Sequence, residues 1–125
     1  SIIFGNDGSY LKKILDAGDY WLTSYREGIR WLNRNAPPRA IIWLPSVDDF
    51  FMARHYPVRR DLEMGFVVKT PLPGNSYMIV NPGETCWVNL VEASRQKVAE
   101  ELRGMRKVHE IRRQGGEILS IYYKP

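Results

Sequence analysis

The chain has 125 residues, a formal net charge of +4 and 44% hydrophobic residues. This length suits one domain that buries its own core, so folding needs neither a disulfide nor a metal. A single cysteine, Cys86, excludes an internal disulfide, and with only 2 histidines it also excludes a zinc site built on cysteine pairs. The basic residues are scattered and most have acidic neighbours, which argues against a nucleic-acid-binding protein.

The first part of the chain predicts a weakly structured lead-in followed by a firm helix. Residues 1–18 show helical spacing only briefly. Ser24 and Glu27 then fit a capping box, in which each side chain bonds to the other residue's backbone. The two prolines at 37–38 cannot continue a helix. We therefore predict a helix over 24–35, with an apolar face formed by Tyr25, Ile29, Leu32 and Ala36.

The rest of the chain alternates apolar strands with helices. The run over 39–44 predicts a buried strand, and Ser46 with Asp49 three residues later predicts the start of a helix over 46–56. The same patterns predict strands over 62–68, 77–80, 108–113 and 118–123 and a helix over 90–103. The glycine pair at 115–116 predicts that the last two strands form a hairpin. We predict a single three-layer α/β domain over residues 1–125, whose mixed sheet combines a parallel βαβ core with a C-terminal antiparallel hairpin.

The sequence contains no complete catalytic motif. It has neither a dinucleotide-binding fingerprint nor a P-loop, and no serine has the setting of a nucleophile elbow. We therefore predict no catalytic residue, no metal and no cofactor for this chain. Asp48 and Asp49 follow the first strand and Asn81 follows a later one, at positions where α/β folds place ligands. One hypothesis is a small-ligand site near Ser46, Asp48 and Asn81; the other is that the two aspartates only neutralise the start of a helix.

Aromatic and basic side chains form two further candidate surfaces. Tyr20 and Trp21, close to Tyr25, suit a platform on which a sugar or a base stacks, although such aromatics more often pack in a core. A row of arginines one helical turn apart lies on the side of the helix opposite its apolar residues. Such a row either meets anionic headgroups or a phosphate-bearing lipid, or is a solvated face. These residues are Arg26, Arg30 and Arg34.

A resemblance to a known family is carried first by the predicted helix. The segments DYWLTSYREG at 19–28 and WLNRNAP at 31–37 resemble a stretch in the C-terminal soluble domains of bacterial multi-spanning membrane glycosyltransferases. These are the protein-mannosyltransferase-like enzymes of the dolichyl-phosphate-mannose type, which use lipid-linked sugars. Shorter matching segments follow in the same order as far as residue 123, namely RDL at 60–62, YMIVNP at 77–82, HEIRR at 109–113 and ILSIY at 118–122.

The resemblance implies a domain on the extracytoplasmic side of the bacterial cell membrane, following the last membrane span through the lead-in at 1–18. The catalytic acid of such enzymes lies in the membrane region, so the domain would be non-catalytic and would help to position the acceptor or to shape the mouth of the active site. Its implied partners are its own transmembrane region, a lipid-linked sugar or glycan acceptor, and the membrane surface. Leu22 departs from the family, where a small residue is usual, and the segment 87–89 has no family match. The alternative is a free-standing module that binds a small ligand or another protein.

Overall fold

The computed structural model describes residues 24–81, 92–113 and 116–125. Three features of the sequence prediction lie outside these residues. They are the lead-in over 1–18, the aromatic pair Tyr20 and Trp21, and the hairpin turn at 114–115. In chain order the described elements are a helix over residues 24–35, β1 (Ile41–Leu44), α2 (Val47–Ala53), β2 (Glu63–Phe66), β3 (Ser76–Val80), α4 (Glu92–Arg103), β4 (Arg106–Arg113) and β5 (Gly116–Lys124).

The described strands form one mixed sheet, as the sequence predicts. Their order across the sheet is β2-β1-β3-β5-β4. β1 is parallel to both β2 and β3, whereas β5 is antiparallel to β3 and to β4. The β1-α2-β2 unit is the predicted βαβ crossover, and β4 with β5 forms the predicted antiparallel pair at the sheet edge. Both halves of the predicted topology are therefore confirmed.

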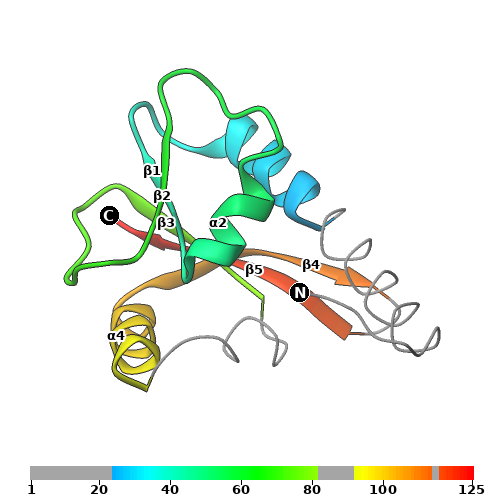
Figure 1. Cartoon of the computed structure of the whole chain (residues 1–125). Coiled ribbons are helices and arrows are strands. Elements are labelled where there is room, and N and C mark those ends of the chain that lie inside the picture. Colours follow the sequence, from blue (N-terminus) through cyan, green and yellow to red (C-terminus); the bar gives the residue numbers. More distant parts are fainter. Residues whose placement is uncertain (1–23, 82–91, 114–115) are drawn as a thin grey trace.

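Two hydrophobic clusters, one on each face of the sheet, make the domain three-layered. On one face, Ile42 of β1 and Ile79 of β3 pack with Ile29 and Leu32 of the 24–35 helix. On the other face, Met78 of β3 packs with Val98 of α4 and with other buried apolar residues. All five residues of β3 are buried, because this central strand is covered on both sides. Figure 1 shows the 24–35 helix and α4 on opposite sides of the sheet.

The 24–35 helix lies unusually close to the sheet. A Cβ atom added at Gly28 would come within 2.8 Å of Cδ2 of Leu119 in β5, so glycine permits this approach. The helix ends near residue 35, as the following prolines predict. The expectation that Ser24 caps this helix is wrong. Ser24 is itself helical and fully buried, so the helix begins no later than this residue.

α2 begins as the sequence predicts and ends earlier than predicted. Ser46 has an extended backbone, and its side-chain oxygen accepts a hydrogen bond from the backbone N–H of Asp49. Helical structure ends at Ala53 with Arg54 as the C-cap, rather than near residue 56. The short α2 connects β1 to β2 and lies on the same face of the sheet as the 24–35 helix, since Phe50 and Met52 pack against the same hydrophobic cluster.

Candidate functional site

The polar residues predicted as ligand contacts lie at the carboxyl ends of β1 and β3. These strands are parallel, with Trp43 beside Met78, so the residues that follow them reach the same edge of the sheet. Ser46 follows β1 and Asn81 follows β3, and both are buried. The edge at which α/β folds place ligands is therefore polar in this domain.

Asp49 is engaged in a buried hydrogen-bond network at this edge. The side-chain hydroxyl of Tyr25 donates to Oδ1 of Asp49 at 2.9 Å, and the hydroxyl of Ser46 donates to Oδ2 at 2.8 Å. Asp49 is only 6% exposed, whereas the neighbouring Asp48 is exposed. The two aspartates thus face different environments, and the network connects the 24–35 helix to the first turn of α2. The two donated hydrogen bonds offset the cost of burying this carboxylate.

Tyr25 and Trp31 pack within the domain. Tyr25 is fully buried. Trp31 stacks on His109 of β4, with ring centroids 4.7 Å apart and an interplanar angle of 9°, and it meets Tyr77 edge-on at 6.5 Å. These contacts fasten the helix to the sheet, as the packing interpretation predicts.

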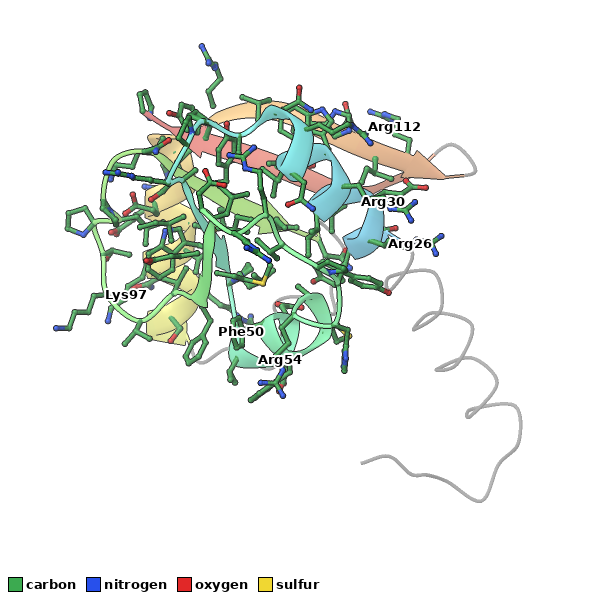
Figure 2. All side chains as sticks on the ribbon, turned by 90° about the horizontal axis from the view of Figure 1, so that it is seen from above. Arg26, Arg30, Phe50, Arg54, Lys97 and Arg112 are labelled. Carbon is green, nitrogen blue, oxygen red and sulfur yellow. The ribbon has the colours of Figure 1, made fainter. Side chains whose placement is uncertain are left out.

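The predicted arginine row is present on the solvent side of the 24–35 helix. Arg26, Arg30 and Arg34 are all exposed, while Leu32 on the opposite side of the helix is buried. Figure 2 shows Arg26 and Arg30 projecting from the same side of this helix. Among the described residues, none of the three arginines forms a salt bridge. The row is therefore a solvent-facing cationic surface.

A cleft lies at the border between the first two arginines of this row and the buried side of the helix, and sequence reasoning missed it. Its volume is about 230 Å³, and Arg26, Arg30 and Ile29 line one side. Asn33, Tyr56 and Pro57 complete the lining. The second wall comes from the segment after α2, which folds back against the helix. We call this space the arginine cleft.

Hydrogen bonds across the arginine cleft hold its second wall in place. The side-chain amide of Asn33 donates to the backbone oxygen of Pro57 at 3.0 Å. The backbone N–H of Arg59 in turn donates to Oδ1 of Asn33 at 2.9 Å. Asn33 thus uses both ends of its amide to fasten residues 57–59 to the helix.

The guanidinium of Arg59 caps the C-terminal end of the same helix. It donates to the backbone oxygens of Asn33 at 2.9 Å and of Ala36 at 2.9 Å, and it pairs with Asp61 at 2.6 Å. Carbonyl groups at a helix end lack partners inside the helix, so a planar guanidinium with several donors suits this position. The side-chain hydrogen bond from Arg59, and then the backbone N–H of Arg39, hold the pKa of Asp61 well below its usual range.

A second, more apolar hollow lies on the other face of the sheet. Its volume is about 340 Å³, and its lining includes Trp43, Phe66 and Leu72, with Lys69 also contributing. Nε1 of Trp43 donates to the hydroxyl of Ser76 at 3.1 Å, which holds the indole in position. This volume is at the lower end of the range of about 300–1,000 Å³ that is usual for small-molecule sites.

Within the described ranges, no group of three or more His, Cys, Asp or Glu residues is arranged to hold a metal ion. No helix in the same part of the chain combines the length and the apolar character needed to cross a bilayer.

Comparisons of the chain with protein-family models, with curated proteins and with solved structures found no match. Function therefore has to be inferred from the residues themselves.

Proposed function

We propose that this chain is a non-catalytic, extracytoplasmic domain of a bacterial multi-spanning membrane glycosyltransferase that uses a lipid-linked sugar donor. Its role is to position the acceptor or to shape the mouth of the active site, together with the transmembrane region of the same protein. The proposal is supported by the family-like segments that occur in order from residue 19 to residue 123.

The non-catalytic part of the proposal rests on one observation. Polar groups at the strand ends are engaged in hydrogen bonds within the domain. Asp49, the buried acid at this edge, accepts hydrogen bonds from Tyr25 and Ser46 and connects two helices. At the opposite edge, Ser76 at the start of β3 donates to the backbone oxygen of Pro73 and accepts from Trp43. These contacts hold the fold together, so the sugar-transfer chemistry would be supplied by another part of the protein.

Several residues that carry the family resemblance have structural contacts in the fold. Tyr25 bonds to Asp49, Trp31 stacks on His109, and Asn33 fastens residues 57–59. A segment that organises a domain in this way is suited to an accessory domain, because its pattern follows from packing and not from catalysis.

Kinetics of the complete membrane protein test the proposal. Transfer of sugar from a lipid-linked donor would be measured for the complete protein, for a variant lacking residues 24–125, and for the isolated domain. We expect the truncated protein to bind donor but to lose efficiency toward acceptor, and the isolated domain to transfer no sugar. Turnover by the isolated domain, or unchanged acceptor kinetics after truncation, would contradict the proposal.

One observation favours the alternative of a small-ligand-binding module, namely the apolar hollow beside Trp43 and Phe66. A planar or ring-shaped ligand that stacked on this indole would change its fluorescence. Titration of the domain with monosaccharides and short oligosaccharides, using Trp43→Phe as the control, distinguishes the two functions. A saturable change that disappears in Trp43→Phe supports the ligand-binding module.

A further inference from the structure

The arginine cleft combines cationic and apolar groups in an arrangement that suits one class of ligand. Arg26 and Arg30 are four residues apart, so they are neighbours on the surface of the helix. Both line the cleft together with the apolar side chain of Ile29 and the rings of Tyr56 and Pro57. We propose that this cleft binds a phosphate group, with the two guanidinium groups as its principal ligands.

Charge and geometry both favour a phosphate. The 24–35 helix carries Arg26, Arg30 and Arg34 against the single acid Glu27, and the two arginines of the cleft form no salt bridge among the described residues. A guanidinium is planar and presents paired N–H donors that match two phosphate oxygens at once. Two such groups one turn apart on the helix surface can contact the same anion.

The wall facing the arginines is held in place by contacts that involve neither arginine of the cleft. Asn33 bonds to the backbone of Pro57 and of Arg59, and the Arg59 side chain bonds to carbonyls at the end of the helix. The cleft therefore exists before a ligand arrives, and binding does not have to order a loop. A preformed site binds more tightly than one that must first be organised.

The size of the arginine cleft limits the ligand. A volume of about 230 Å³ is smaller than the roughly 300–1,000 Å³ of sites that enclose a whole small molecule. It accommodates a phosphate group and a few attached atoms, with the rest of the ligand outside. The apolar lining from Ile29 and Pro57 reduces the water around the anion, which strengthens its attraction to the arginines.

Two sources can supply this chemistry, a soluble phosphate monoester or the headgroup of an anionic lipid. The experiment therefore has two arms. In the first, inorganic phosphate and glycerol 3-phosphate are titrated into the isolated domain and followed by NMR signals of the arginine side chains. In the second, the domain is co-sedimented with vesicles of phosphatidylcholine alone and with vesicles of phosphatidylcholine and phosphatidylglycerol in equal parts.

Three double variants distinguish binding in the arginine cleft from nonspecific attraction of an anion to a positively charged surface. Arg26→Gln with Arg30→Gln removes the proposed ligands. Arg34→Gln with Arg103→Gln changes the net charge by the same amount at exposed positions outside the cleft. Arg26→Lys with Arg30→Lys keeps the charge but removes the planar, paired donors. All four arginines are exposed, so we expect each variant to keep the urea unfolding midpoint of the wild type.

We expect Arg26→Gln with Arg30→Gln to weaken binding by about 30-fold, in line with the usual contribution of two basic residues near an anionic surface. The control pair should change binding far less, and the lysine pair should lose several-fold despite its unchanged charge. Saturable binding of inorganic phosphate or glycerol 3-phosphate identifies a soluble ligand. Binding only to vesicles that contain phosphatidylglycerol identifies a lipid headgroup.

Equal losses in the glutamine pair and the control pair, or binding in neither arm, would overturn the inference. The inference rests on the geometry of the arginine cleft and not on the proposed role in sugar transfer. A failure here would therefore leave the kinetic test of that role unaffected.

Discussion

The hydrogen bond from Tyr25 to Asp49 gives the sharpest test of the buried network at the strand ends. Tyr25 is fully buried, and its hydroxyl lies 2.9 Å from Oδ1 of a carboxylate that is itself only 6% exposed. Tyr25→Phe keeps the ring and its apolar contacts but removes this donor. A hydrogen bond to a charged group contributes about 1.5–3 kcal/mol, so we expect the variant to lose about 2 kcal/mol of unfolding free energy.

Urea denaturation measures this loss, with Tyr123→Phe as a matched control. The Tyr123 hydroxyl is half-buried and donates to the neutral Oδ1 of Asn75 at 3.1 Å, so its removal should cost about 1 kcal/mol or less. In a double-mutant cycle, Tyr25→Phe should cost much less when Asp49 has already been changed to Asn. Equal losses at the two tyrosines, or strict additivity in the cycle, would refute this account of the network.

Three further predictions concern single side chains. Lys124→Met should lower the unfolding free energy in urea by about 2 kcal/mol, because Nζ of Lys124 lies 2.7 Å from the nearly buried carboxylate of Glu101. A loss below about 0.5 kcal/mol would mean that solvent screens this pair. Arg39→Gly should raise the thermal midpoint through a gain of up to about 1 kcal/mol, because Arg39 has a φ of 64° in the left-handed region; a lower midpoint would contradict this. The pKa of Asp61 is lowered in the fold because Arg59 bonds to its charged form. The stability that Asp61 contributes to the fold is therefore present above the unfolded pKa of about 3.9 and disappears as the pH falls below that value. As the pH falls through that range, the urea unfolding midpoint of Asp61→Asn should fall less than that of the wild type. Equal falls in the two proteins would contradict this role of Asp61.

Elements determined by nearby residues could be predicted from the sequence. The start of α2 follows from Ser46 and Asp49, which are three residues apart and bond to each other in the structure. The end of the 24–35 helix follows from the two prolines at 37–38, which need no tertiary contact to stop it. The exposure of the arginine row follows from helical spacing, because the buried positions of the same helix determine the opposite side.

Contacts between distant segments could not be predicted in the same way. Arg59 bonds to carbonyl groups more than twenty residues earlier in the chain, and nothing in its own neighbourhood indicates that partner. The arginine cleft depends on this contact and on Asn33, so local sequence patterns do not indicate it. The spacing from Ser46 distinguishes Asp49 from Asp48 in the sequence. Only the fold shows that Tyr25 also donates to Asp49 and completes a buried network.

The central proposal is that this domain is part of a membrane-embedded glycosyltransferase. Sequencing the coding region that precedes Ser1 tests it most directly. The account predicts several apolar segments upstream, each of about 20 residues and long enough to span a bilayer, in the same reading frame. A start codon shortly before Ser1, with no such segment between them, would contradict it.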